Sequence, residues 1–206
     1  GRGTREDQRT PALVLGLPAV PRRARVMVAA GYRHSAASTS AGELLVWGCN
    51  NRSQLGLGDR EDRTAPATLG PERFGGWPVL MVACGACHTV TVTEVGRVFT
   101  FGYGGSGRLG LGDTNNRDAP VEVEPARFRG ARIAYAVAGA NHSGVVTSDG
   151  RVYTWGWARF GQLGHNDTQN ELVPRELEGQ FGESVAVMLA AGASHTLFLM
   201  TDGAVW

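Results

Sequence analysis

The chain has little of what several protein classes require. It has three cysteines among 206 residues, and this small, odd number argues against a disulfide framework. It contains no run of 18 apolar residues, which argues against a transmembrane helix. Its first ten residues are polar and charged, unlike a signal peptide. We therefore expect an intracellular protein, cytoplasmic or nuclear, that does not enter a membrane.

An excess of charge of one sign is also missing. Twenty basic and 19 acidic residues leave a formal charge of +1. No field from the chain as a whole therefore favours nucleic acid or an anionic membrane, although a local patch is not excluded. We do not expect direct binding to nucleic acid or chromatin.

Glycine is abundant, and it recurs at fixed offsets. Four histidines lie 54, 54 and 53 positions apart, each three residues after a glycine. A period of about 50 residues indicates a solenoid, propeller or array, in which one unit cannot bury its apolar face alone. The repeated pairs are Gly31 and His34, Gly85 and His88, Gly139 and His142, and Gly192 and His195.

Each repeat follows one template of short β-forming runs. A small-residue run ends in G-x-x-H-[ST], a second run ends in an aromatic residue and glycine, and [QR]-L-G-x-x-D and a proline follow. Val98 and Thr100 alternate with Phe99 and Phe101, which is the period-2 pattern of a strand with two unlike faces. The template predicts three to four strands per unit, a leucine in the core, an aspartate in a turn and an edge strand that tolerates proline. These positions are Leu55, Leu109 and Leu163; Asp59, Asp113 and Asp167; and Pro66, Pro120 and Pro174.

We therefore predict an all-β fold: a β-propeller forming a partial ring of between three and four repeats. Residues 1–206 are expected to form one repeat domain that is incomplete at both ends, because residues 6–11 resemble residues 61–66 and Trp206 is the aromatic residue of a further repeat. The approximate repeat boundaries are 1–25 (the tail of a preceding repeat), 26–79, 80–133, 134–186 and 187–206 (the start of a further repeat).

The segments V-A-A-G-Y-R-H-S, V-A-C-G-A-C-H-T and L-A-A-G-A-S-H-T, with the W-G or F-G strands and the Q-L-G-L-G-D loop, resemble the regulator of chromosome condensation repeat family. The resemblance extends from about Arg5 to the end of the chain. It implies a seven-bladed β-propeller in the full-length protein, with one blade per repeat and about half of the ring in this chain.

The family hosts unrelated functions, so the fold does not decide the activity. The resemblance favours a non-enzymatic protein-interaction propeller that regulates a small GTPase, above all as a guanine-nucleotide exchange factor. The alternatives are the substrate-recruiting propeller of a HECT-type ubiquitin ligase, whose catalytic domain would lie outside this chain, and a chromatin-binding module. The family's plant photoreceptor repeats G-W-R-H-T; only residues 31–35 approach that motif, with Tyr32 in place of tryptophan, and we do not expect light sensing.

Two motifs suggest cofactors, and the repeat explains both. Cys84, Cys87 and His88 spell the C-x-x-C-H of a haem or zinc site, but His88 is the recurring histidine and no second cysteine pair exists. Residues 102–107 spell G-x-G-x-x-G, yet the glycine-rich sequence that follows does not predict the helix that a dinucleotide site requires. We expect no cofactor, no metal and no enzyme site. The recurring histidines are interpreted as structural, with ring nitrogens bonded to neighbouring backbone groups.

Binding residues are expected where the repeats differ. The loops at residues 49–53, 103–107 and 157–161 vary most, and they carry arginine and aromatic residues, which are enriched in protein interfaces. The alternative is that Trp157 and Phe160 pack between blades. The segment before the first recurring histidine provides a second candidate patch. The candidate binding residues are Tyr32, Arg33, Arg52, Tyr103, Trp157, Arg159 and Phe160.

Overall fold

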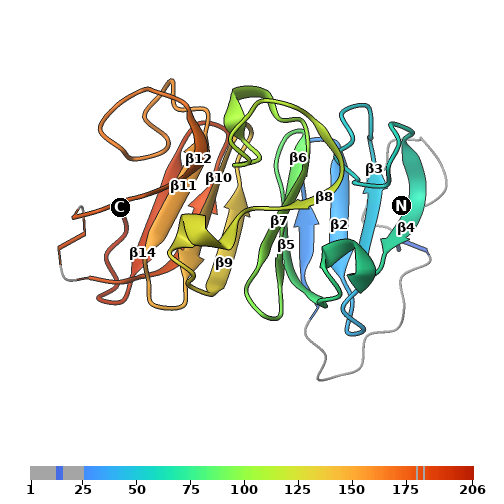
Figure 1. Ribbon diagram of the computed structural model, residues 1–206, viewed down its shortest axis with the longest axis horizontal. Coiled ribbons are helices and arrows are strands. Elements are labelled where there is room, and N and C mark those ends of the chain that lie inside the picture. The colour runs from blue at the N-terminus through green and yellow to red at the C-terminus, as the bar shows by residue number, and fades with distance from the viewer. Residues whose placement is uncertain (1–12, 16–25, 180, 183) are drawn as a thin grey trace.

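The computed structural model describes residues 13–15, 26–179, 181–182 and 184–206. These residues form four antiparallel sheets that follow one another along the chain and stand side by side in an open arc (Figure 1). The predicted all-β class is confirmed. The predicted repeat tail at residues 1–25, including the segment 6–11, lies almost entirely outside the described residues.

Three of the sheets are four-stranded meanders, and the fourth has two strands. The first sheet contains β1 (Val28–Ala30), β2 (His34–Ser38), β3 (Leu44–Gly48) and β4 (Arg63–Leu69). The second contains β5 (Val79–Cys84), β6 (His88–Thr93), β7 (Val98–Gly102) and β8 (Arg117–Glu122). The third contains β9 (Ile133–Ala138), β10 (His142–Thr147), β11 (Val152–Gly156) and β12 (Glu171–Glu176), and the fourth β13 (Ala186–Ala191) and β14 (Thr196–Met200).

The first strand of each sheet is its innermost strand. β1, β5, β9 and β13 contact one another in sequence order, and their alanine-rich sequences allow this close approach. The last strands, β4, β8 and β12, are edge strands. They contain the three repeated prolines, as predicted, because an edge strand tolerates a residue that lacks a backbone N–H.

The hydrophobic core lies between successive sheets. One cluster joins Leu44 and Leu55 of the first repeat to Phe99 and Phe101 of the second, and a second cluster joins the second and third sheets in the same way. The predicted core leucines Leu55, Leu109 and Leu163 are fully buried. Each sheet is therefore stabilised by its neighbour, as expected of a unit that cannot bury its apolar face alone.

The two ends of the sheets differ. One end, at the top of Figure 1, carries the G-x-x-H turns and the long loops that follow β3, β7 and β11, and we call it the loop face. The opposite end carries two short 3₁₀ helices, η1 (Pro71–Phe74) and η3 (Pro125–Phe128), which the sequence analysis did not predict. Each begins with a proline and buries a phenylalanine, Phe74 or Phe128.

The glycine that ends each W-G or F-G strand is required by the backbone. Gly102 has φ +105°, and a Cβ atom there would lie 2.6 Å from the carbonyl oxygen of Cys87. Gly48 and Gly156 share this conformation. These glycines let the long loop start directly beside the G-x-x-H turn.

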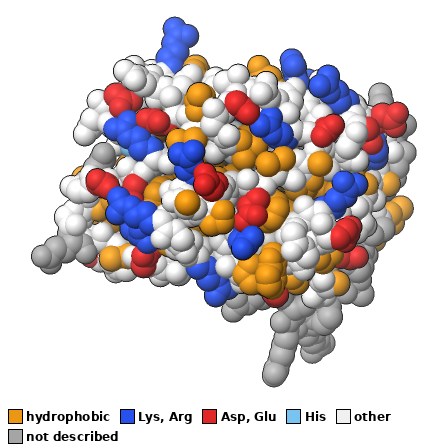
Figure 2. All heavy atoms as spheres, viewed as in Figure 1, with side chains coloured by type: hydrophobic (Ala, Val, Ile, Leu, Met, Phe, Trp, Pro, Cys, Tyr) orange, Lys and Arg blue, Asp and Glu red, His pale blue; other side chains and the backbone are white. Residues whose placement is uncertain are grey.

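The visible surface carries both signs of charge. In the view of Figure 2, arginine and acidic side chains alternate across the molecule with apolar side chains between them. This distribution agrees with the formal charge of +1.

Candidate binding face

The variable loops begin beside the G-x-x-H turns of their own sheets. The backbone N–H of Cys49 donates to the carbonyl of Arg33 at 2.8 Å, and that of Trp157 donates to the carbonyl of Asn141 at 2.9 Å. Tyr103 makes the same bond to Cys87 at 2.9 Å. The two candidate patches of the sequence analysis therefore lie on one face of the molecule.

Two arginines, one from the first long loop and one from the second, lie against the ring of Tyr103. The guanidinium carbon of Arg52 lies 5.0 Å from the ring centroid of Tyr103, and that of Arg108 lies 4.7 Å away. Both distances are within the range of cation–π attraction. This contact joins the first loop to the second and fixes the tyrosine ring at their boundary.

Arg108 belongs to the site, although the sequence analysis missed it. It is buried, and it donates from Nε to the carbonyl of Gly105 at 2.8 Å and from Nη1 to the carbonyl of Ala140 at 3.3 Å. Burial lowers the pKa of its guanidinium. The signal in the sequence was an arginine where the other repeats have Gln54 and Gln162.

Trp157 and Phe160 contact each other in the third loop. Their ring centroids are 5.2 Å apart in an edge-to-face arrangement. Trp157 is half-buried, whereas Phe160 is 64% exposed and Arg159 is exposed. Phe160 therefore projects from the face, and the alternative of packing between blades does not describe it.

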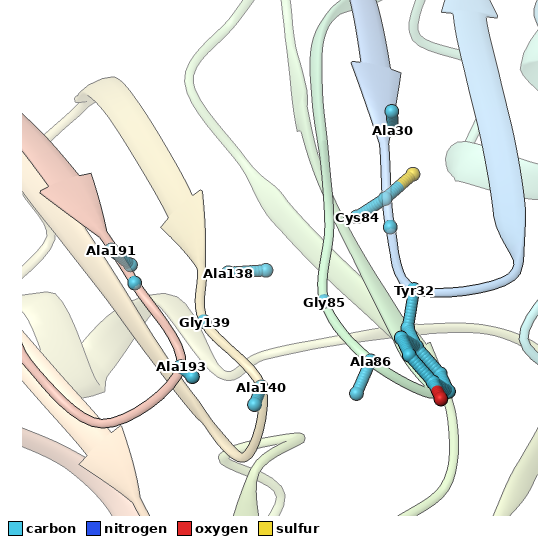
Figure 3. Close-up of a pocket in the computed structure, with 12 residues that line it drawn as sticks. Ala30, Tyr32, Cys84, Gly85, Ala86, Ala138, Gly139, Ala140, Ala191 and Ala193 are labelled. Carbon is cyan, nitrogen blue, oxygen red and sulfur yellow. The ribbon is translucent and has the colours of Figure 1, made fainter.

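Tyr32 stands at the mouth of a shallow hollow formed by the innermost strands. The hollow has a volume of about 320 Å³ and is lined by glycine and alanine residues together with Cys84 and Tyr32. Figure 3 shows Tyr32 beside Ala86, as the one bulky side chain among the labelled residues. Tyr32 is 75% exposed, and the Arg33 guanidinium lies 5.4 Å from its ring centroid. The hollow has no charged lining for acid–base chemistry.

The recurring histidines link neighbouring sheets. His34 Nε2 lies 3.0 Å from Thr89 Oγ1 of the second sheet, and this hydroxyl donates to the carbonyl of Gln54 at 2.7 Å. The same three-residue link recurs from His88 through Ser143 to Arg108, and from His142 through Thr196 to Gln162. The histidines thus join neighbouring sheets, and in each link Nε2 contacts a side-chain hydroxyl of the next repeat.

The link determines the histidine tautomer. Since each hydroxyl uses its proton on a carbonyl, the ring donates from Nε2. Burial lowers the pKa of these rings below 6.5, so at neutral pH the ring is neutral and Nδ1 is unprotonated. The preceding glycine makes room for the ring, because a Cβ at Gly85 would lie 2.2 Å from His88 Cε1. His195 is exposed, and in the described part of the chain no hydroxyl faces it.

The two motifs that suggested other chemistry have local explanations. Cys84 is buried, and burial raises the pKa of its thiol to about 12. The G-x-G-x-x-G segment is followed by a turn, and its only helical part is the three-residue 3₁₀ helix η2 (Gly105–Gly107). Among the described residues, no group of three or more His, Cys, Asp or Glu side chains is placed to hold a metal ion. The described helices are also too short to cross a membrane.

The repeated aspartates lie in the outer part of the same loops. Asp59 Oδ1 accepts a hydrogen bond from the backbone N–H of Glu61 at 2.9 Å, and Asp113 and Asp167 repeat this bond with Asn115 and Gln169. Their predicted role as turn residues that bond the local backbone is confirmed. This backbone hydrogen bond, followed by the contact with Arg63, lowers the pKa of Asp59.

Comparison with known proteins agrees with this architecture. Residues 1–206 match the family model described as an RCC1-like domain. The ultraviolet-B receptor UVR8 of Arabidopsis thaliana is 37% identical over 203 residues, which cover 98% of this chain and 44% of the receptor. The probable E3 ubiquitin-protein ligase HERC4 of Homo sapiens is 37% identical over 183 residues, covering 88% of this chain and 17% of the ligase.

The fold is similar to a solved structure. The crystal structure of Prp20p from Saccharomyces cerevisiae matches with a TM-score of 0.70 at 20% identity, covering 82% of this chain and 42% of Prp20p. The predicted propeller blades and the resemblance stated from the sequence are confirmed. The chain spans less than half the length of these three relatives.

We predict that Thr89→Val destabilises the protein by about 2–3 kcal/mol, because it leaves the buried His34 Nε2–H and the Gln54 carbonyl without a partner. Thr89→Ser is the matched control, since serine occupies this position in the third repeat. It keeps the hydroxyl and loses one methyl group, at a cost of about 1 kcal/mol. Urea unfolding measures both, and equal losses would show that the hydroxyl is not the stabilising group.

We also predict that stability falls as the pH is lowered from 6.5 towards 4. Burial lowers the pKa of His34 and of His142 from 6.5 to about 4, and lowers that of His88 well below 6.5. Between pH 6.5 and 4 these histidines bind protons in the unfolded chain but not in the native protein. The free energy of unfolding therefore has its full value above pH 6.5 and decreases below it, by up to about 1.4 kcal/mol per pH unit for each histidine.

Urea unfolding at pH 7.5, 6 and 5 measures this dependence. His34→Gln should reduce the slope, because it removes one of the three buried histidines. A slope that His34→Gln does not alter would contradict the assignment.

Proposed function

This chain belongs to the family of RCC1-like domains, and we propose that its loop face binds a small GTPase and regulates it as a guanine-nucleotide exchange factor. An RCC1-like domain is a non-catalytic interaction module. We place its action inside the cell, in the cytoplasm or the nucleus.

The observation that carries the proposal is the contrast between the scaffold and the loop face. The histidine links and buried leucines are the same in successive repeats. The loop face instead presents a different set of arginine and aromatic side chains in each repeat, and Tyr32 and Phe160 are largely exposed. These residue types dominate the binding energy of protein interfaces.

Nucleotide exchange fits a face of this kind. An exchange factor needs no nucleophile, because it binds the nucleotide-free GTPase more tightly than the loaded one and so shifts the equilibrium towards release. The Prp20p structure, which shares this fold, was described together with the binding of Prp20p to Gsp1p and histones. That likeness motivates the choice of a GTPase as the first partner to test.

A second candidate is substrate recruitment for a ubiquitin ligase. The 37% identity to human HERC4 over 88% of this chain favours it. In that case the chemistry would belong to other parts of a longer protein, and binding would not depend on the nucleotide state of the partner.

One assay distinguishes the two candidate functions. The chain is added to purified small GTPases loaded with a fluorescent GDP analogue, and release of the analogue is followed with excess unlabelled GTP. Accelerated release from one GTPase supports exchange. If no GTPase releases its nucleotide faster, and none is retained by the chain in the nucleotide-free state, the exchange proposal is wrong.

We call the GTPase that the chain binds in the nucleotide-free state the retained GTPase. We predict that the double variant Tyr32→Ala with Phe160→Ala weakens binding to it at least tenfold, about 1.4 kcal/mol. Both side chains are largely exposed, so the melting temperature should change little. Val95→Ala, which removes a partly exposed apolar side chain from the β6–β7 turn on the opposite face, is the control. A large loss of melting temperature in the double variant would show that these residues are structural.

A further inference from the structure

On the loop face, basic and acidic residues lie at different distances from the innermost strands. The segments nearest those strands contain four arginines and no acidic residue, and we call them the inner rim. The inner rim comprises residues 31–33, 49–54, 85–87, 103–108, 139–141, 157–162 and 192–194, and its arginines are Arg33, Arg52, Arg108 and Arg159.

The outer part of the same loops is acidic and largely paired. Residues 59–63, 113–118 and 167–175 contain seven acidic and four basic residues. Each repeated aspartate forms an ion pair with an arginine of its own loop. The pairs are Asp59 with Arg63 at 2.6 Å, Asp113 with Arg117 at 2.7 Å and Asp167 with Arg175 at 3.0 Å.

The inner arginines have no such partner. In the described part of the chain, none of the four lies within 4.0 Å of a carboxylate oxygen, whereas seven other arginines do. Arg33, Arg52 and Arg159 are exposed. The guanidinium of Arg33 lies against the ring of Tyr32, and that of Arg52 against the ring of Tyr103.

The inner arginines lie along a continuous path of contacts. Arg33 adjoins the start of the first loop through its carbonyl, and Arg52 of that loop reaches Tyr103 of the second. Arg108 continues from Tyr103 to Ala140, beside the Asn141 carbonyl that holds the start of the third loop. The path therefore crosses three sheets and ends at the loop that contains Arg159.

The environment of Arg108 strengthens this positive potential. Its guanidinium is buried, donates to two carbonyls and lies against the tyrosine ring, and its charge adds to burial in lowering the pKa of His88. A buried cation without a counter-ion is costly, and an incoming carboxylate would offset that cost. The chain has no lysine, so every basic group is a guanidinium, whose planar fork matches a carboxylate.

We propose that the inner rim is the docking site for an extended acidic peptide segment of the protein partner, with its carboxylates on the exposed Arg52 and Arg159 and with the buried Arg108 adding positive potential. This inference rests on the proposed function and names the chemistry of the partner surface that meets this face. A nucleic acid fits less well, because its backbone would continue outward over the seven acidic residues of the outer loops.

The test uses residues that the repeat itself provides. The triple variant Arg52→Ser, Arg108→Gln and Arg159→Asn places at each position the residue of another repeat: Ser106, Gln54 and Asn51. The control is Arg73→Gln, Arg127→Gln and Arg132→Gln, which removes the same charge near the opposite face. If the triple variant does not fold, Arg52→Ser with Arg159→Asn makes the same test at two exposed positions.

The probe is a fluorescein-labelled ten-residue peptide with six aspartates and one tyrosine, and its binding is measured by fluorescence anisotropy. We expect the wild-type chain to bind it more weakly at 300 mM than at 50 mM salt, as screening requires. The triple variant should lose at least tenfold in affinity and the control less than twofold. No measurable binding, or equal losses in the two variants, would overturn the inference.

Two further measurements test whether the inner rim binds a nucleic acid or a second copy of this chain instead of an acidic peptide. A single-stranded oligonucleotide of equal charge that binds more tightly than the peptide would overturn the acidic-peptide assignment. Sedimentation of the wild-type chain as a dimer that the triple variant dissociates would do the same, because the occupant would then be a second copy.

The retained GTPase separates this inference from the proposed function. If it binds the triple variant normally and fails to bind the Tyr32→Ala, Phe160→Ala variant, the function stands and the acidic-segment inference fails. If neither variant alters GTPase binding, the loop-face function fails, whereas loss of peptide binding in the triple variant would still support the acidic docking site.

Discussion

The structure depends on the hydrogen-bonded link from a histidine ring to a hydroxyl and a carbonyl across each boundary between sheets. In the first link, His34 contacts Thr89, which lies 55 positions away, and Thr89 contacts the Gln54 carbonyl of the loop that precedes its own repeat. The link is buried, so each polar group needs its partner. It fixes both the spacing of the sheets and the position of the long loop.

Other repeated residues follow from this constraint. Glycine precedes the histidine because a Cβ atom would meet the ring, and glycine ends the aromatic strand because the loop must begin beside the G-x-x-H turn. The leucine of each L-G turn is buried, and Leu55 belongs to the cluster between the first and second sheets. A scaffold stabilised in this way leaves the loop residues free to differ, and their differences distinguish one repeat from the next.

Much of this scaffold could be predicted from sequence, because it is repeated. Alignment of the repeats showed that the C-x-x-C-H and G-x-G-x-x-G motifs are variants of one template. It also identified the core leucines, the turn aspartates and the edge prolines. The hydroxyl partner of His34 could not be identified, because no local pattern connects it to residue 89. Arg108 was missed for a related reason: its importance comes from Tyr103 and Ala140 around it, not from its place in a motif. That the two candidate patches share a face also required the hydrogen bonds between turn and loop.

The central claim is that neutral histidines join the sheets by donating from Nε2. Nitrogen-detected NMR of the histidine rings at neutral pH tests it directly, because it distinguishes the two neutral tautomers from the imidazolium. The structure predicts that His34, His88 and His142 carry their proton on Nε2 and leave Nδ1 unprotonated. Protonation on Nδ1, or a charged ring, at these three positions would contradict the link and the account of the fold built on it.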